Sequence, residues 1–320
     1  MLIPRRILFV LFILIGTLLN AQQSMFVSSY VRGNFYNRGR ISTESLRASD
    51  DLIFLNVHPN KDGSLSFENP RLFQGKGVDT WEGLIKSVRA KVKGTATKIR
   101  LGASSGQWKA MVADEAARVA FAENIKKVLQ KNKLDGIDLD FEWAENKKEY
   151  DDYSLAILKM REVLGDQYIF SVSLHPVCYK ISKEAIAAVD FISLQCYGPS
   201  PVRFPVEKYC SDIQMVLKSG IPKEKLVVGV PFYGVTKDGS KKTEAYFSFV
   251  QDGLITSPAQ NEVTFKDNVY VFDGQDNIRT KTRYAKDQKL KGMMSWDLAT
   301  DLPFDDDRSL FKAMVKELGR

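Results

Sequence analysis

Three carboxylates occupy alternate positions of one short apolar stretch, "LDGIDLDFEW", residues 134–143: Asp138, Asp140 and Glu142. In an extended strand, alternate side chains point to the same face, so the three acids share one face and the apolar residues between them share the other. Successive acids are then about 6.6 Å apart along the backbone, and their carboxyl groups can approach each other. This crowding predicts that at least one carboxyl keeps its proton, and a retained proton can serve as a general acid.

The three acids differ in their expected access to a substrate. Glu142 is the outermost and has the longest side chain, so we expect it to be the acid, with Asp140 as its neighbour and Asp138 deeper. Glycosidases usually place two carboxylates on opposite sides of the scissile bond, which a single strand cannot do. We therefore expect a substrate that carries its own nucleophile, the 2-acetamido oxygen of an N-acetylglucosamine unit, with Asp140 binding the amide N–H and Tyr197 binding the carbonyl. The alternative is that the acids bind a cation or support the fold, although hard cations usually take ligands from a loop or from several elements.

The elements that must position these residues follow a regular order. Eight short apolar runs are typical of strands and begin at residues 25, 51, 98, 136, 168, 190, 225 and 292. Helical periodicity between them predicts helices over 113–131, 148–164, 206–218, 278–289 and 308–318, a weaker one over 42–48, and one that opens with a capping box formed by Asp79 and Glu82. This alternation indicates the α/β class, as a parallel barrel or an open doubly wound sheet. The acids favour a single-domain (β/α)8 TIM barrel, because central strands of an open sheet are covered by helices on both faces.

Polar and aromatic residues gather at the carboxyl ends of the predicted strands, where barrel enzymes keep their chemistry. They are His58, His175, Gln195, Tyr197, Tyr233 and Trp296, with Tyr30 in the first strand. Each alone is more often a packing residue than a ligand, but together with three acids they favour a carbohydrate cleft, because sugars stack on aromatic rings and need fixed polar partners. We predict that Trp296, Gln195, Tyr30 and Tyr233 bind substrate. Trp143 should point to the opposite face and pack at the rim, if the strand continues that far.

The N-terminus has the layout of a cleaved secretory signal over residues 1–21, with two arginines, an apolar run and "LNA", although a retained anchor is an alternative. We expect a catalytic domain over 22–320 that is secreted or periplasmic, monomeric and not held at the membrane once the signal is cleaved.

The formal net charge of +7 comes from 46 Lys and Arg against 39 Asp and Glu scattered along the chain, which does not indicate nucleic-acid binding. Two histidines and three cysteines without metal-type spacing predict no metal site and no cofactor. The sequence leaves two alternatives for Cys178 and Cys196: they form a disulfide, or they are buried free thiols.

The chain resembles glycoside hydrolase family 18, the family of chitinases and endo-β-N-acetylglucosaminidases. "DGIDLDFE", residues 135–142, matches the family signature D-G-x-D-x-D-x-E, and "VDFISLQCYG", "LVVGVPFYG" and "GMMSWDL" resemble its sixth, seventh and eighth strands. The resemblance implies that Glu142 acts as acid and then as base, that Asp140 positions the acetamido group and that Asp138 tunes Asp140. It further implies that Tyr197 stabilises an oxazolinium-like intermediate, that Trp296 stacks under the cleaved sugar, and that the configuration at the anomeric carbon is retained.

The sequence departs from the family pattern at two places. Gly198 stands where the sixth strand usually has Asp or Asn, with Gln195 where Met is frequent, and "GASSG", residues 102–106, blurs the third-strand pattern S-x-G-G. The segment 235–291 is too short for the full insertion of many chitinases, so we expect an open groove, a hairpin within 263–274 and no accessory carbohydrate-binding module. These features favour a chitinase acting on soluble oligomers, with an endo-β-N-acetylglucosaminidase acting on the chitobiose core of N-glycans as the alternative. A non-catalytic lectin is a third interpretation, which the presence of Glu142 disfavours.

Overall fold

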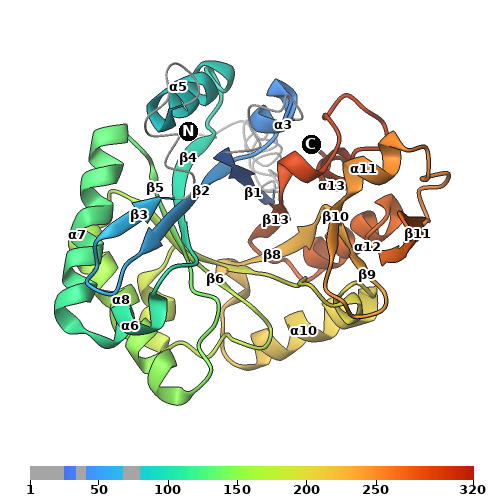
Figure 1. Ribbon diagram of the computed structural model, residues 1–320. Helices are drawn as coiled ribbons and strands as arrows, with labels where there is room; N and C mark the ends of the chain where they lie inside the picture. The colour runs from blue at the N-terminus through green and yellow to red at the C-terminus, as the bar shows by residue number, and fades with distance from the viewer. Residues whose placement is uncertain (1–24, 34–40, 68–79) are drawn as a thin grey trace, which may run out of the picture.

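Eight parallel strands close into a barrel at the centre of the computed structural model, which describes residues 25–33, 41–67 and 80–320 (Figure 1). The first strand pairs in parallel with both the second and the last, which closes the sheet and confirms the predicted (β/α)8 barrel. All eight expected strands are present. They are β1 (Phe26–Arg32), β2 (Asp51–Pro59), β4 (Lys98–Ser104), β5 (Gly136–Asp140), β6 (Ile169–Leu174), β7 (Phe191–Leu194), β8 (Leu226–Pro231) and β13 (Gly292–Trp296), and a short β3 (Leu65–Phe67) pairs antiparallel with β2. The predicted signal over residues 1–21 lies outside the described residues, as does Asp79.

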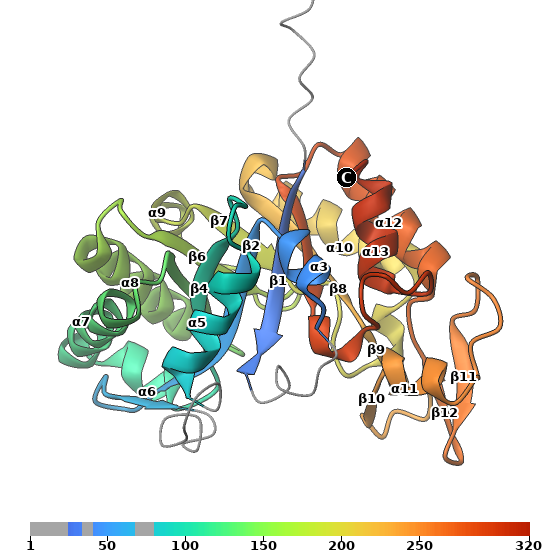
Figure 2. The same ribbon diagram turned by 90° about the horizontal axis from the view of Figure 1, so that it is seen from above.

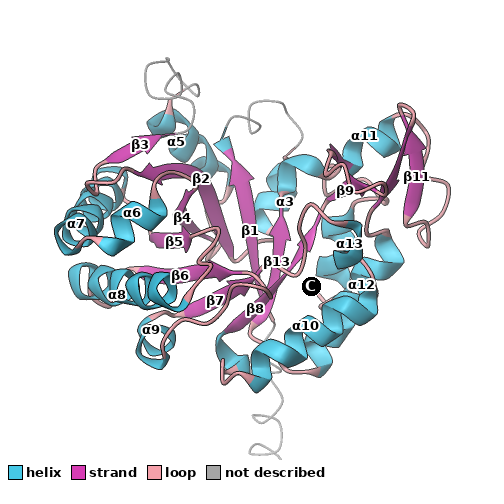
Figure 3. Ribbon diagram, turned by 60° about the horizontal axis from the view of Figure 1, so that its bottom comes forward, coloured by secondary structure: helices cyan, strands magenta, loops and turns pink. Residues whose placement is uncertain are grey.

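Helices connect the barrel strands and surround them (Figure 3). They are α3 (Thr43–Arg47), α5 (Trp81–Lys91), α6 (Trp108–Ala113), α7 (Glu115–Asn132), α8 (Lys147–Leu164), α9 (Lys183–Ala188), α10 (Val206–Lys218), α12 (Gln275–Asp287) and α13 (Leu310–Glu317), with short 3-10 turns at Pro201–Arg203, Lys223–Lys225 and Leu298–Thr300. Within the described part of the chain, none of the helices is long and apolar enough to span a membrane.

Capping side chains set two helix boundaries differently from the sequence prediction. The helix predicted to begin with Asp79 begins at Trp81, and Thr80 is its N-cap, with the Thr80 side chain accepting from the Gly83 N–H. The helix predicted over 113–131 is α7 and begins two residues later, at Glu115, because Asp114 has extended backbone angles and its side chain accepts from the Ala117 N–H. The short helix α6 before it was not predicted. Both boundary errors arise because any short polar residue near a helix start can be the cap.

Strand β5 has the alternation that its sequence predicts. Its apolar residues Ile137 and Leu139 are fully buried on the helix side, while Asp138 and Asp140 are 0% and 3% exposed on the barrel interior. The first two residues of the signature have structural roles. Asp135 accepts a hydrogen bond from the Ile99 N–H of β4 at 2.8 Å, and a Cβ at Gly136 would lie 1.9 Å from the Ile169 carbonyl oxygen of β6. The "DG" therefore fixes the start of the strand between its two neighbours.

The segment between β8 and β13 forms a small antiparallel sheet beside the barrel (Figure 2). It contains β9 (Tyr233–Thr236), β10 (Thr243–Ala245), α11 (Tyr246–Gln251), β11 (Glu262–Phe265) and β12 (Asn268–Val271). Strands β11 and β12 pair antiparallel, which confirms the predicted hairpin. A buried ion pair connects this segment to α12: Lys281 Nζ lies 2.7 and 2.6 Å from the two carboxylate oxygens of Asp273.

Candidate active site

Asp138 lies at the bottom of the site and is surrounded by hydroxyl groups. The Tyr30 hydroxyl donates to Asp138 Oδ2 at 2.7 Å, and Ser171 and Ser173 donate to Oδ1 and Oδ2 at 2.5 and 3.1 Å. Burial raises the pKa of Asp138, whereas the Arg100 charge and the three hydroxyl donors oppose that rise. Asp138 is therefore held as an acceptor by side chains from β1 and β6.

Asp140 and Glu142 form the next layer, with a single amide between them. Gln195 Nε2 donates to Asp140 Oδ1 at 2.9 Å, and the Gln195 side chain also contacts Glu142. Burial raises the pKa of Asp140 well above its ordinary value, and the charges of Glu142 and Asp138 add to the rise. Loss of hydration also raises the pKa of Glu142, although this side chain reaches solvent. Both carboxyls therefore take up a proton more readily than free acids do, as a general acid requires, and the general-acid role of Glu142 stays a prediction.

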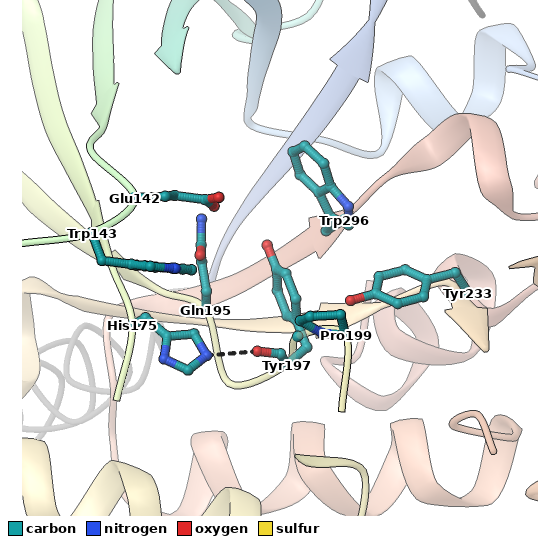
Figure 4. Close-up of a pocket in the computed structure, with 9 residues that line it drawn as sticks. Glu142, Trp143, His175, Gln195, Tyr197, Pro199, Tyr233 and Trp296 are labelled. Carbon is teal, nitrogen blue, oxygen red and sulfur yellow. Dashed lines mark hydrogen bonds between the residues drawn. The ribbon is translucent and has the colours of Figure 1, made fainter. Parts of the chain in front are cut away.

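Aromatic side chains form the wall opposite Glu142 (Figure 4). Tyr197 and Trp296 lie nearly parallel, with 20° between planes and 6.5 Å between centroids, and Tyr233 stands edge-on to Tyr197 at 6.4 Å. Burial raises the pKa of Tyr197 well above its usual value, so its hydroxyl stays protonated. Its contact is Met294 Sδ at 3.7 Å, a weak acceptor, which leaves a donor that a ligand oxygen can compete for.

The pocket between these walls has a volume of about 190 Å³. Its lining contains five of the residues predicted to be catalytic or to bind substrate: Glu142, Gln195, Tyr197, Tyr233 and Trp296. Asp138 and Asp140 lie beneath the surface, as a positioning role requires.

The role expected for Tyr30 is corrected. This side chain is fully buried under the Trp296 ring, with centroids 5.1 Å apart, and is not part of the pocket lining. Its hydroxyl donates to Asp138, so we expect Tyr30 to act on the acid and not on the substrate. The register of β1 explains this, because Tyr30 lies in the middle of the strand and below the mouth.

The structure adds Trp143, Gly198 and Pro199 to the pocket, and it places there His175, one of the polar residues expected at the strand ends. Trp143 does not point to the opposite face, because β5 ends at Asp140 and the strict alternation ends with it; its ring packs on His175 at 4.7 Å between centroids. The His175 Nε2–H is directed at the Tyr197 carbonyl at 2.9 Å, and Nδ1 accepts from the Val177 N–H at 3.3 Å. Burial lowers the pKa of His175 to about 4, so it is neutral near pH 7 and fixes the wall that carries Trp143.

The two departures from the family pattern have local consequences. At Gly198 an added Cβ would meet His175 Nε2 at 3.6 Å, which leaves room on this side of the pocket. The "GASSG" loop has positive φ at Ser105 (54°) and Gly106 (80°), and its Ser104 carbonyl contacts His58 Nδ1 at 2.6 Å. His58 therefore secures a loop and is not in the pocket lining.

The described residues contain no cluster of metal ligands and no disulfide. Across the described residues, no three His, Cys, Asp or Glu side chains are grouped so as to hold a metal ion. Cys178, Cys196 and Cys210 are free thiols.

A parallel barrel with stacked carboxylates at the end of its fourth strand and an aromatic wall opposite defines a glycoside hydrolase. The chain belongs to the glycosyl hydrolases family 18, whose family model matches residues 27–301. The probable chitinase 2 of Drosophila melanogaster is 23% identical over 259 residues, which is 62% of this chain. The match spans about half of that longer protein, 54% of its length.

Solved structures share the fold over almost the whole chain. The family 18 chitinase ChiB from the chitin utilization locus of Flavobacterium johnsoniae superposes with a TM-score of 0.74 at 25% identity, covering 92% of this chain and 94% of that one. The family 18 chitinase of Cycas revoluta, solved with (GlcNAc)3, superposes with a TM-score of 0.73 at 17% identity, covering 91% of this chain and 99% of that one.

Proposed function

We propose that the protein hydrolyses β-1,4 bonds next to N-acetylglucosamine in chitin oligomers, by substrate-assisted catalysis. One observation carries the proposal: in the described part of the chain, Glu142 is the only carboxylate in the pocket lining. The residues that face it are aromatic or uncharged, so no described carboxylate stands opposite to attack the anomeric carbon or to activate a water there.

The proposed reaction has two displacements. Glu142 gives its proton to the glycosidic oxygen while the acetamido carbonyl oxygen of the substrate attacks the anomeric carbon, and the leaving sugar departs as an alcohol. The Glu142 carboxylate then takes a proton from water, whose oxygen attacks the same carbon and reopens the oxazolinium ring. Asp140 accepts the acetamido N–H and the Tyr197 hydroxyl donates to the acetamido oxygen. Two inversions give retention of configuration.

The shape of the site supports short, soluble substrates. Before α12, the segment between β8 and β13 adds only a small sheet and one short helix to the barrel, and Gly198 leaves one side of the pocket unfilled. The curated relative and the two solved chitinases are consistent with an N-acetylglucosamine polymer as the substrate class.

Hydrolysis of the chitobiose core of N-glycans is the second candidate, because the same acids and the same acetamido nucleophile would serve it. Parallel incubation with chitohexaose and with a high-mannose glycoprotein, followed by mass spectrometry, separates the two. Short N-acetylglucosamine oligomers from chitohexaose support the proposal, whereas release of a whole glycan with chitohexaose left intact overturns it. Binding of chitotriose without any cleavage would instead identify a lectin.

We also propose that cleavage after Ala21 releases a secreted or periplasmic monomer. The support is the order of features in residues 1–21, which are two arginines, then an apolar run, then "LNA". Intact-mass measurement of the mature protein and its elution volume in size-exclusion chromatography test the cleavage site and the oligomeric state.

A further inference from the structure

A fully buried ion pair lies in the barrel interior below the three acids. Arg100 of β4 bonds Asp51 of β2 through two parallel contacts, Nε to Oδ1 at 2.7 Å and Nη2 to Oδ2 at 2.6 Å. The side chains are 0% and 1% exposed, and the guanidinium lies over the Phe191 ring at 4.8 Å. Charged side chains this deeply buried need a compensating arrangement, and this one is a bidentate pair.

The remaining donors of Arg100 point toward the catalytic strand. Its Nη1 donates to the Ile137 carbonyl of β5 at 3.0 Å and to Ser171 Oγ of β6 at 2.8 Å. Ser171 Oγ in turn donates to Asp138 Oδ1 at 2.5 Å. A chain of hydrogen bonds therefore runs from the Asp51 carboxylate through Arg100 and Ser171 to Asp138.

The direction of this chain is fixed by the chemistry of the guanidinium. Arginine has only donors, so Ser171 Oγ must accept from Nη1, and its single hydrogen is left for Asp138. Asp138 Oδ1 is then an acceptor, while Oδ2 receives the Tyr30 hydroxyl. Both oxygens are used as acceptors, which favours the ionised form of Asp138.

We propose that Arg100 is a positioning residue for the hydrolysis: through Ser171 it holds Asp138 ionised, so that the proton retained by the acids resides on the Asp140–Glu142 pair. The inference rests on the proposed function, since it concerns the proton that Glu142 delivers. The Arg100 charge lowers the pKa of Asp138 against the effect of burial. The titratable and charged groups around Asp138 are Tyr30 on β1, Asp51 on β2, Arg100 on β4, Asp140 and Glu142 on the same segment, Tyr153 on α8 and Tyr197 after β7.

The sign of the expected effect follows from these contacts. Without the Arg100 charge, Asp138 takes up a proton at higher pH. The acidic limb of the profile of kcat/KM against pH therefore moves to higher pH. The basic limb should move little, because at that pH Asp138 is ionised with or without the Arg100 charge. The pH range of activity therefore narrows from the acidic side.

The decisive variant is Arg100→Gln with Asp51→Asn, which removes both charges together and keeps polar groups at both positions. We expect its acidic limb to move up by about one pH unit and Ser171→Ala to produce a smaller shift in the same direction. Arg100→Lys keeps the charge and should restore the limb toward that of the unmodified protein. The matched control is Lys281→Gln with Asp273→Asn, a second buried ion pair outside the pocket. It should lower the Tm without moving either limb.

Carboxyl 13C NMR titration with labelled aspartate measures the pKa of Asp138 directly and does not rely on turnover. The Asp138→Asn variant assigns the resonance. A higher Asp138 pKa in the charge-removed variant supports the proposal even if the unmodified protein cuts N-glycans or cuts nothing, so failure of the proposed function remains a separate result. Superimposable titrations and pH profiles, with only a lower Tm as in the control pair, would show that Arg100 is structural. If the double variant does not fold, the Ser171→Ala titration decides: an unchanged Asp138 pKa overturns the proposal.

Discussion

Asp138 and Asp140 are two residues apart on one strand and both are buried, yet their surroundings differ. Asp138 accepts from three hydroxyl groups and lies near a guanidinium. Among the described residues, the Asp140 side chain has a single hydrogen-bond partner, Gln195. Burial raises the pKa of both, but only Asp140 also has like charges on either side of it, from Asp138 and Glu142. We call Asp138 the lower layer and the pair Asp140 and Glu142 the upper layer. The surroundings of the lower layer stabilise a negative charge, whereas those of the upper layer favour a retained proton. Substitutions close to the proton that Glu142 transfers should therefore reduce activity more than substitutions farther from it.

The largest effect is expected for Glu142→Gln, which removes the transferable proton but keeps size and polarity. The kcat for chitohexaose should fall about 10³-fold, because general acid catalysis contributes about that much. Affinity for the oligomer, measured by isothermal titration calorimetry, should change little. The control is Glu145→Gln, an exposed residue paired with Lys109 at 2.8 Å, which should keep full activity. Full activity of Glu142→Gln would contradict the mechanism.

Asp140→Asn comes second and tests the upper layer directly. It replaces the acceptor for the acetamido N–H by an amide, and we expect kcat to fall about 10²-fold. It also removes the negative charge beside Glu142, so the pKa of Glu142 falls and the basic limb of the pH profile moves to lower pH. A basic limb that stays in place would show that the two carboxyls do not share a proton.

The upper layer was predictable from the sequence to a greater extent than the lower one. Strand alternation is local, so the order of Asp138, Asp140 and Glu142 on one face follows from spacing alone, and so does the barrel that this face requires. The partners of Asp138 come from β1, β4 and β6, and no local pattern relates Tyr30 to a residue 108 positions away. Trp143 escaped prediction because alternation holds only while the strand lasts. His175 was visible as a candidate, but its role depends on the Tyr197 carbonyl, which only the fold brings near.

The two tryptophans of the pocket should differ in their contribution to catalysis. Trp296 lies on the wall with Tyr197, the predicted partner of the acetamido group, while Trp143 lies on the loop wall against His175. Trp296→Ala should lower kcat/KM about tenfold, the loss of about 1.5 kcal/mol of aromatic contact. Trp143→Ala should have a smaller effect, about threefold. Steady-state kinetics on chitotetraose and chitohexaose would measure both, and equal losses would show that the loop wall binds sugar as strongly as the strand wall.

The smallest effect on rate is expected for Tyr30→Phe, which removes one donor from the lower layer. Asp138 keeps its serine donors and the Arg100 charge, so kcat should fall only a few-fold, while the acidic limb of the pH profile moves slightly up because the ionised form of Asp138 has lost a hydrogen bond. The free energy of unfolding should drop by about 1 kcal/mol, the usual cost of one buried hydrogen bond, as measured by urea denaturation. Tyr209→Phe is the matched control: its hydroxyl is equally buried but contacts only the Met293 sulfur at 3.8 Å among the described contacts, so the pH profile should not move. A loss for Tyr30→Phe as large as that for Asp140→Asn would mean that the proton is distributed over all three acids and that the division into two layers is wrong.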